Sequence, residues 1–346
     1  MSDAPTSPIP VAVLGATGMV GQRMVQLLDG HPWFQVAALT ASERSAGRPY
    51  ADAAAWRLTG RAPASVAAMP VRSTDPHGLP GGLRIAFSAL DGGVARPMEE
   101  AFREAGWLVI SNASAFRSDP DVPLVIPEVN PHHVALLDRR PGQGGILTNP
   151  NCCAIPLAMV LAPLQARWPV QALTVATWQA VSGAGYPGES AWDMIGSVHP
   201  HPGDEEQKLA SEPLKILGLP GTPLQFPISA RCVRVPVADG HLLGMHLRLQ
   251  GDPDPDEVAH ALAGWTGNGP DLPSSPRPLS VVDDRRDRPA TRFDVDQGGG
   301  MAITVGRVER CAVMGVKLYA LAHNTIRGAA GAAIANAELL VRLGRV

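Results

Sequence analysis

The sequence predicts a two-domain α/β protein, with a parallel sheet in the first domain and a mixed, largely antiparallel sheet in the second. Before Pro150, short apolar runs alternate with segments of helical spacing, as in a parallel sheet with crossover helices. After Asn151 the apolar runs are longer and few helical segments separate them, which favours a mixed sheet. A chain of 346 residues is also long for one hydrophobic core, which favours two.

Composition excludes several classes of function. The chain is 45% hydrophobic and 18% charged, with a formal net charge of −3. It therefore has neither the basic field of a nucleic-acid-binding protein nor the charge excess of a disordered one. No signal-peptide pattern begins the chain, and no apolar run is long enough to span a membrane. We therefore expect a cytoplasmic protein that acts on small molecules and binds neither nucleic acid nor a membrane.

The expected elements of the first domain are short. Residues 18–29 have apolar side chains at helical spacing, and Gly30 suits the position after a helix end. Residues 97–105 predict a second helix, which Gly106 follows. The expected strands of this domain cover residues 10–14, 35–40, 83–90 and 107–111.

The second domain is expected to consist mainly of longer strands. Asp239 and Gly240, between two of them, indicate a hairpin turn. The Ala-rich residues 325–343 predict a helix that returns to the first domain. The expected strands of this domain cover residues 170–181, 229–237, 241–250, 301–309 and 312–323.

A glycine-rich motif follows the first strand and opens the first helix. Such glycines permit a tight turn, close approach of the backbone to a pyrophosphate and close packing of helix on strand, and the helix N-terminus favours the phosphate charge. The motif therefore indicates a dinucleotide site, although glycines that serve only the turn are the alternative. It runs Gly15-Ala16-Thr17-Gly18-Met19-Val20-Gly21, and the residues expected to bind the cofactor are Gly15, Thr17, Gly18, Met19 and Val20.

The end of the second strand indicates which dinucleotide is bound. An NAD enzyme places an acidic residue there for the ribose 2′-hydroxyl. Here Arg44 can pair with a 2′-phosphate, and Ser42 and Ser45 can donate hydrogen bonds to its oxygens, which favours NADP. Glu43 leaves NAD as the alternative, and a solvated loop without a cofactor role is the other.

One cysteine is a candidate nucleophile. Four cysteines are too few for a disulfide framework and lack the paired spacing of a zinc site. Cys152 directly follows an Asn-Pro-Asn turn and opens an apolar helix, whose dipole and free N–H groups would lower the pKa of a thiol. The adjacent Cys153 should point elsewhere, because one residue turns a helix by about 100°. The alternative is a buried Cys-Cys pair in a hydrophobic core.

Seven segments in this order resemble the aspartate-semialdehyde dehydrogenase family, particularly its archaeal and fungal branch. The resemblance spans nearly the whole chain, and seven ordered motifs are far more specific than any one of them. The segments are Gly15 to Gly21, Ser42 to Gly47, Ser111 to Ser114, Asn149 to Cys152, Gln179 to Gly185, Cys232 to Arg234 with His241, and His323 to Gly331.

The resemblance implies a role for four residues of the reacting centre. Cys152 matches the nucleophile, His241 the acid and base, and Gln179 the glutamine beside the reacting atoms. Arg234 matches the arginine that binds the substrate carboxylate. Without the resemblance, His241 would be a solvated turn residue and Arg234 an outward-facing charge on a strand. Cys153 stands where the family usually has Ser or Thr, so its role is open.

Four further residues match substrate positions of the family. Glu205 matches the acid that contacts the substrate amino group. Lys208, Arg117 and Asn112 match the residues that hold phosphate. Glu205 and Lys208 fit the exposed face of a charged helix equally well.

The resemblance also completes the expected cofactor site. Asn324 matches the asparagine that faces the nicotinamide, and Ser182 and Gly183 belong to the matching cofactor segment. No metal site is expected, because His199 and His201 alternate with prolines and have no clear third ligand.

The implied reaction is the reversible, phosphorylating oxidation of aspartate semialdehyde. The Cys152 thiolate attacks the aldehyde, His241 handles the proton on the oxyanion, and backbone donors at the helix start stabilise its charge. Hydride passes to NADP, and phosphate then attacks the thioacyl enzyme to yield aspartyl phosphate. The biosynthetic direction, toward lysine, threonine and methionine, reverses these steps.

Two other functions are alternatives to this interpretation. A reductase of another acyl donor, such as malonyl-CoA, would keep the same thiol, histidine and cofactor site. A non-catalytic NADP-binding sensor would need only the first motif.

The resemblance also implies a domain architecture. It consists of a Rossmann-type NADP-binding domain over residues 1–150, a catalytic and dimerisation domain like that of glyceraldehyde-3-phosphate dehydrogenase over 151–323, and a returning helix over 324–346. The implied assembly is a homodimer or a dimer of dimers.

Overall fold

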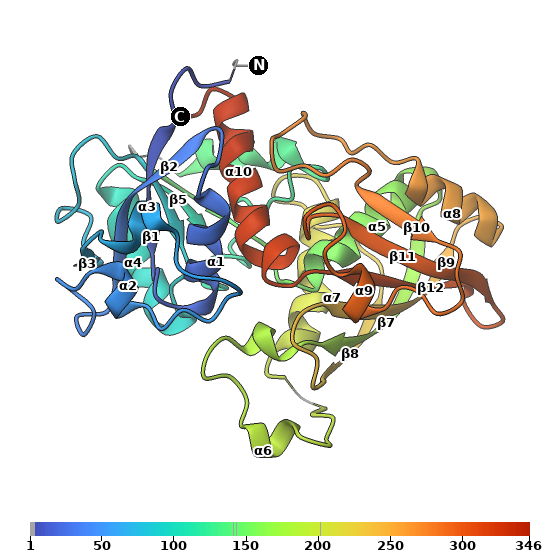
Figure 1. The fold of residues 1–346 in the computed structure, drawn as a ribbon. Coiled ribbons are helices and arrows are strands. Elements are labelled where there is room, and N and C mark those ends of the chain that lie inside the picture. Colours follow the sequence, from blue (N-terminus) through green and yellow to red (C-terminus); the bar gives the residue numbers. More distant parts are fainter. Residues whose placement is uncertain (1–3, 141, 143, 201) are drawn as a thin grey trace.

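The computed structural model describes residues 4–140, 142, 144–200 and 202–346. Figure 1 shows two lobes, one built from the first part of the chain and one from the middle and later parts. The C-terminal helix α10 stands between the lobes, at the side of the first. Within the described residues, no helix is long and apolar enough to cross a membrane.

The first lobe is a six-stranded parallel sheet with the strand order β3-β2-β1-β4-β5-β6. The order reverses between β1 and β4, and in such sheets ligands bind beyond the strand ends at this reversal. Residues 11–14 of β1 are fully buried because helices cover both faces of the sheet. The strands are β1 (Ile9–Leu14), β2 (Phe34–Ala41), β3 (Val71–Ser73), β4 (Ile85–Ser88), β5 (Leu108–Ser111) and β6 (Gly145–Thr148). The helices are α1 (Met19–Leu28), α2 (Tyr50–Ala53), α3 (Ala64–Ala67), α4 (Gly92–Glu104) and the 3-10 helix η1 (Pro131–Arg139).

The second lobe is a mixed six-stranded sheet with the order β10-β11-β12-β9-β7-β8. The pairs β10–β11 and β7–β8 are parallel, and the three pairs between them are antiparallel. The strands are β7 (Val170–Gln179), β8 (Ile228–Arg234), β9 (His241–Leu249), β10 (Ser280–Asp283), β11 (Ile303–Cys311) and β12 (Gly315–Ala322). The helices are α5 (Ala154–Arg167), η2 (Val181–Ala184), α6 (Ala191–Met194), α7 (Glu205–Leu217), α8 (Pro255–Ala263) and α9 (Thr291–Asp294).

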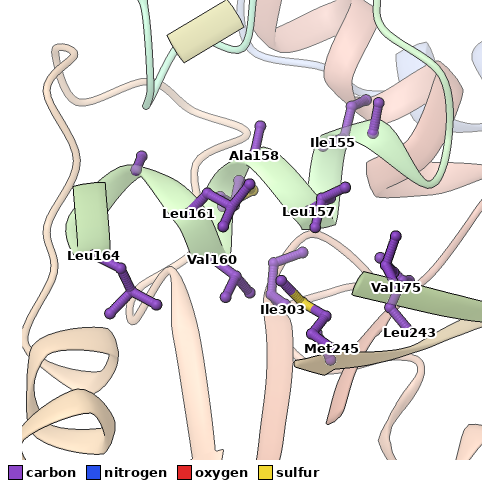
Figure 2. Close-up of a cluster of buried hydrophobic side chains, with 14 of the residues drawn as sticks. Ile155, Leu157, Ala158, Val160, Leu161, Leu164, Val175, Leu243, Met245 and Ile303 are labelled. Atoms are coloured by element: carbon purple, nitrogen blue, oxygen red, sulfur yellow. The ribbon is translucent and has the colours of Figure 1, made fainter. Parts of the chain in front are cut away.

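Helix α5 forms the centre of the second hydrophobic core. Its side chains are buried from Ala154 to Leu164, and they pack on the inward-facing residues of β7, β9 and β11 (Figure 2). Burial alternates along β9, so that one face of the sheet lies on α5 and the other is open. The core therefore fixes the start of α5, where Cys152 lies, against the strand that begins with His241.

The end of the chain packs against the first lobe. A π-helical turn, η3 (Ile326–Ala330), precedes α10 (Gly331–Arg342). Leu339 and Leu340 are fully buried in the core that also contains β1 and β4 residues. Arg327 is fully buried and donates to both oxygens of Glu128 at 2.9 and 2.7 Å, which neutralises its charge.

Most expected elements are confirmed, but three strands and several helices, such as α8, were not expected, and one expected turn is wrong. The parallel and mixed sheets have the expected character, and Gly30 and Gly106 both follow helix ends with positive φ. Strands β3, β6 and β10 were not expected, because three or four residues give too short an apolar run. The hairpin expected at Asp239 and Gly240 is wrong: β8 and β9 lie on opposite sides of β7 and do not pair.

Candidate active site

The glycine-rich motif lies at the strand reversal and borders a cleft between the lobes. Gly15 has φ 73°, and a Cβ atom there would lie 2.6 Å from the Ala89 carbonyl oxygen, so only glycine fits. A Cβ at Gly21 would meet the Gly15 carbonyl, which explains the close packing of α1 on the turn. Gly18 caps α1 without a side-chain hydrogen bond, so the first N–H groups of the helix have no side-chain acceptor there. This backbone cradle fits a dinucleotide pyrophosphate.

The cleft has a volume of about 600 Å³ and is lined by both lobes. Asn324 donates to the Ser182 hydroxyl at 2.8 Å and accepts the Gly240 N–H at 2.8 Å. The Ser182 hydroxyl in turn donates to Asp239 at 2.8 Å. The structure therefore joins the expected cofactor residues Ser182 and Asn324 in one network. Lining residues include Met19, Arg23, Arg57, Val181, Ser182, Tyr186, Glu189 and Asp239.

The loop expected to select the cofactor is exposed. Ser42 and Arg44 are solvent-exposed beyond the end of β2, and the N–H of Ser45 donates to the Ser42 carbonyl at 2.9 Å. Within the described residues, no ion pair holds Arg44. Glu43 is equally exposed, so the loop geometry alone favours neither NADP nor NAD.

Cys152 lies in the turn just before α5, whose N-cap is Cys153. The Cys153 thiol donates to the Cys152 sulfur and, together with the nearby His241 and Arg117, lowers the pKa of Cys152 well below its ordinary value, although burial opposes the shift. Burial and the adjacent Cys152 raise the pKa of Cys153. Cys152 is therefore the better nucleophile of the pair.

The start of α5 differs from expectation in two ways. The N–H groups of Cys153 and Ala154 both donate to the Asn151 side-chain oxygen, at 2.9 and 3.3 Å, so they are not free to stabilise an oxyanion. The two sulfurs also do not diverge: both lie within 4.8 Å of each other and of a ring nitrogen of His241. The expected divergence of about 100° fails because Cys152 precedes the helix and has a turn conformation.

His241 begins β9 and is fully buried. Its Nδ1 accepts the N–H of Ala180 at 3.0 Å, so the neutral ring has its proton on Nε2. Within the part of the chain that is described, Nε2 has no hydrogen-bond partner. The ring therefore presents an N–H to the cysteine pair.

The same tautomer argues against a metal at the two cysteines and His241, which together have the composition of a soft-metal site. A metal-binding imidazole uses one nitrogen as ligand and donates from the other, whereas Nδ1 of His241 faces a donor. Of the two histidines considered for metal, Nδ1 of His199 lies 3.8 Å from the Glu189 carboxylate, and His201 lies outside the described residues.

Arg234 ends β8 and is 5% exposed. Its Nη1 donates to the Gln179 side-chain oxygen and to the Ala180 carbonyl, both at 3.1 Å. Its buried Nε has no hydrogen-bond partner among the described residues and lies 3.9 Å from a Glu189 oxygen. A Cβ at Gly183 would lie 2.9 Å from both Arg234 and His241, so glycine keeps open the space between these two side chains. A small carboxylate fits an arginine edge of this kind.

Gln179 links the arginine to an acidic residue. Its amide nitrogen lies 3.3 Å from Glu205, while its oxygen accepts from Arg234. Glu205 also accepts from Asn151 at 2.9 Å and from Lys208 at 3.1 Å. The structure therefore brings together the expected residues for the substrate carboxylate and amino group.

Of the residues expected to hold phosphate, Arg117 and Asn112 contact each other near the Asn151 backbone, whereas Lys208 pairs with acidic residues at the start of α7. Arg117 donates to the Asn112 carbonyl at 2.5 Å and to Glu212 at 3.3 Å. Glu212 also accepts the Asn151 N–H at 2.6 Å, and burial raises its pKa despite these contacts. Lys208 lies on the same helix, α7, and pairs with Asp204 and Glu205 at 2.6 and 3.1 Å.

Sequence reasoning missed Glu212 and Glu189. Glu205, Lys208 and Glu212 are spaced i, i+3 and i+7 and therefore share one face of α7, a signal that could have revealed Glu212. Glu189 has no such signal, because it lies in the irregular segment between η2 and α6.

The chain matches two family models. The NAD binding domain of semialdehyde dehydrogenase matches residues 10–137, and the dimerisation domain of semialdehyde dehydrogenase matches residues 161–327. The gap between the matches, residues 138–160, contains β6, the last strand of the first sheet, and the start of α5.

Individual proteins are similar over nearly the whole length. The aspartate-semialdehyde dehydrogenase of Methanothermobacter thermautotrophicus is 45% identical, over 96% of this chain and 99% of that protein. The crystal structure of the Candida albicans aspartate semialdehyde dehydrogenase with NADP has a TM-score of 0.90 and 37% identity, covering 98% of this chain and 100% of that one. A malonyl CoA reductase (NADP) of Metallosphaera sedula is 35% identical over 98% of both chains. With these matches, the chain belongs to the semialdehyde dehydrogenase family and is similar to its archaeal and fungal aspartate-semialdehyde dehydrogenases.

Proposed function

We propose that this chain is an NADP-dependent aspartate-semialdehyde dehydrogenase, which reduces aspartyl phosphate to aspartate semialdehyde and phosphate in the biosynthetic direction. The observation that supports it most is the grouping of Cys152, His241 and Arg234: the Cys152 sulfur lies within 4.8 Å of a His241 ring nitrogen, and His241 and Arg234 both face Gly183. The thiol has a lowered pKa, the imidazole presents an N–H, and the arginine has a buried Nε that no described residue accepts as a hydrogen-bond donor.

Cys152 performs the covalent step. In the oxidative direction its thiolate attacks the aldehyde carbon, and the carbonyl oxygen becomes an oxyanion on a thiohemiacetal. His241 Nε2–H donates to this oxyanion, since Nδ1 is held as an acceptor by Ala180. This role replaces the expected backbone donors at the start of α5, which Asn151 occupies. Bound NADP supplies a nicotinamide ring that accepts hydride from this carbon, which leaves a thioacyl group on Cys152.

Arg234, Gln179 and Glu205 orient the substrate. The guanidinium binds the substrate carboxylate through parallel hydrogen bonds, and the Glu205 carboxylate binds the amino group. Gln179 contacts both residues and fixes their separation. An amino acid side chain with an aldehyde is thereby held with its carbonyl toward Cys152.

Arg117, Lys208 and Asn112 hold the phosphate that attacks the thioacyl carbon, and Cys152 leaves as a thiolate. Arg117 is one of the positive charges that lower the pKa of Cys152, which places it near the reacting sulfur. In the reverse direction, the same cations would bind the phosphoryl group of aspartyl phosphate.

The cofactor assignment combines the cradle with the loop after β2. Gly15, Thr17, Gly18, Met19 and Val20 would hold the pyrophosphate, and Ser42, Arg44 and Ser45 the 2′-phosphate. Ser182, Gly183 and Asn324 would hold the nicotinamide end. The relative from Candida albicans that shares the fold has NADP in its crystal structure.

We further propose that residues 1–150 bind the cofactor, 151–323 catalyse and dimerise, and 324–346 tie the chain end to the first domain. The open face of the second sheet suits an interface between two copies, because Trp178 on it is 36% exposed beside Tyr319. We propose a homodimer or a dimer of dimers, in the cytoplasm.

The second candidate is reduction of malonyl-CoA, which the 35% identical Metallosphaera sedula protein favours. Malonyl-CoA is a shorter acyl thioester without an amino group, so Glu205 would have an amino group to bind only in aspartate semialdehyde. The test is NADPH formation from aspartate semialdehyde, with and without phosphate, beside NADPH oxidation with malonyl-CoA. Turnover of the aldehyde that requires phosphate supports the proposal, and turnover of malonyl-CoA alone overturns it.

A further inference from the structure

Two thiols of unequal character lie side by side at the active site. Cys152 is partly exposed and has a pKa well below the ordinary thiol value, whereas Cys153 is fully buried. Their sulfurs lie within 4.8 Å, and Cys153 donates to Cys152. The proposed reaction uses only the Cys152 sulfur for bond formation, so the second thiol has no role in group transfer.

The backbone around the pair permits the sulfurs to approach further. Cys152 precedes α5, and the residue four positions later is Pro156, which has no N–H to bind the Cys152 carbonyl. Gly328 faces Cys152, and a Cβ at Gly328 would lie 2.7 Å from the Cys152 Cβ. The Cys152 carbonyl therefore has no N–H partner four residues later, and the close packing of Gly328 holds the Cys152 backbone in place beside Cys153.

We propose that Cys153 is a resolving thiol that protects the nucleophile from irreversible oxidation by hydroperoxides. The Cys152 thiolate attacks a peroxide oxygen, the O–O bond breaks, and the departing oxygen takes a proton to form water or an alcohol. Sulfur is thereby oxidised to sulfenic acid and the peroxide is reduced. The Cys153 sulfur then attacks the Cys152 sulfur, an S–S bond forms, and the S–O bond breaks with loss of water.

The resulting bond should be easily reversed. Consecutive Cα atoms lie about 3.8 Å apart across a trans peptide, below the range of about 4.4–6.8 Å usual for disulfides. A disulfide between neighbours is therefore strained, and strained disulfides are the labile, regulatory ones. The enzyme with this disulfide would be inactive but could be reduced back to the active form. A lone sulfenic acid, in contrast, can be oxidised further to sulfinic acid, which thiols do not reduce.

Cys232 is the other cysteine with which Cys153 could form a disulfide. It is buried and close enough to Cys153 to contribute to its raised pKa, and burial raises its own pKa to about 11. Its hydrogen-bond partner among side chains is Thr177, on the adjacent strand β7. Because Cys153, not Cys232, donates to the nucleophile, the bond is assigned to the neighbouring pair.

The first test is peptide mapping of the whole enzyme after hydrogen peroxide treatment without substrate. Remaining thiols are alkylated and the protein is digested without reduction. The expected product is a peptide with Cys152 and Cys153 that lacks two hydrogen atoms, together with activity that returns after dithiothreitol. A Cys153–Cys232 bond, or Cys152 found only as sulfinic acid, overturns the proposal.

The second test compares Cys153→Ser and Cys153→Ala with Cys232→Ser and Cys311→Ser, each normalised to its own untreated rate. Both Cys153 variants should lose most of the activity that dithiothreitol restores, and their Cys152 should form an adduct with dimedone. The two control variants should recover as the unmodified enzyme does. Equal recovery in the Cys153 variants overturns the proposal, and the mass readout remains decisive even if their turnover is low.

Discussion

The side chains of the catalytic pocket are buried and held by protein contacts, whereas those of the cofactor loop are exposed, although the sequence predicted a functional role for both. Arg234, Gln179 and His241 are at most 5% exposed, and protein groups fix one end of each. Ser42 and Arg44 are exposed, and only backbone hydrogen bonds, such as those from Ser45 to Ser42 and from Ala46 to Glu43, order their loop among the described residues. The side chains of the pocket are therefore organised before any ligand binds, whereas the exposed side chains of the loop would be ordered by the ligand. Substitutions in the pocket should change rates strongly, and substitutions in the loop should change affinity modestly.

The largest effect is expected at Cys152. Cys152→Ala should abolish turnover and covalent trapping of substrate, because no nucleophile remains. Cys152→Ser should be almost as inactive, since a hydroxyl is not ionised near neutral pH and a helix N-terminus contributes only about 0.3–2 kcal/mol toward ionising it. Cys153→Ser retains a donor beside Cys152 and should keep most of its activity. Alkylation followed by peptide mapping checks the assignment: first labelling at Cys153, protectable by substrate, would contradict it.

The second-largest effect is expected from substitution of His241. His241→Asn removes the Nε2–H that faces the cysteine pair, and loss of such a group typically costs about 10²–10⁴-fold in rate. The value of kcat should fall more than KM rises, and the pH profile should lose one limb. Steady-state kinetics across pH provide the measurement. An active variant with an unaltered profile would remove the imidazole from the mechanism.

The substrate arginine tests whether the pocket is organised in advance. Arg234→Lys keeps the charge but cannot contact Gln179 and the Ala180 carbonyl while also presenting a planar edge to a carboxylate. We expect kcat/KM for the aldehyde to fall by at least about tenfold, with KM for phosphate little changed. Arg231→Lys, an exposed arginine on the same strand, is the matched control. Equal losses for both substrates would mean that the variant perturbs the whole site.

Arg117 tests the phosphate side of the pocket. Arg117→Ala should raise KM for phosphate more than KM for the aldehyde, because it removes a cation beside Asn112. It also leaves Glu212 buried with one partner fewer, so a lower melting temperature is expected as well. Arg139→Ala, which breaks an exposed pair with Asp121, controls for loss of charge. Unchanged phosphate kinetics would place the anion site elsewhere.

Sequence periodicity was sufficient for long elements and insufficient for short ones. The strand that contains Gln179 has ten residues and a clear alternation of burial, so its type and position followed from the sequence. Val71–Ser73 has three residues and gains its place by pairing with β2, a contact between distant residues that local patterns do not encode. The same reason explains the hairpin error, since the chain inserts β7 between β8 and β9.

The functional site likewise has features that the sequence reveals and features that it does not. The turn-and-helix motif located Cys152, and the family resemblance located Arg234 and His241, which the structure brings close to it. The tautomer of His241 depends on the Ala180 N–H, sixty-one residues away, and no pattern in the sequence reveals that bond. The direction of the Cys153 sulfur likewise depends on where α5 begins, and helix ends are uncertain by one or two residues even in structures.

The smallest effect is expected in the cofactor loop, where Arg44→Ala separates NADP from NAD. Only NADP has the 2′-phosphate that this guanidinium would contact, so KM for NADP should rise while KM for NAD stays constant. Because Arg44 is exposed, water screens the pairing, and the rise should be about two- to fivefold. Glu43→Gln is the matched variant: if Glu43 binds a ribose hydroxyl, KM for NAD should rise instead. Equal KM values for the two cofactors in the unmodified enzyme would refute the NADP preference. A loss at Arg44 as large as that at His241 would show that the loop is as organised as the pocket, and the contrast between the two regions would then fail.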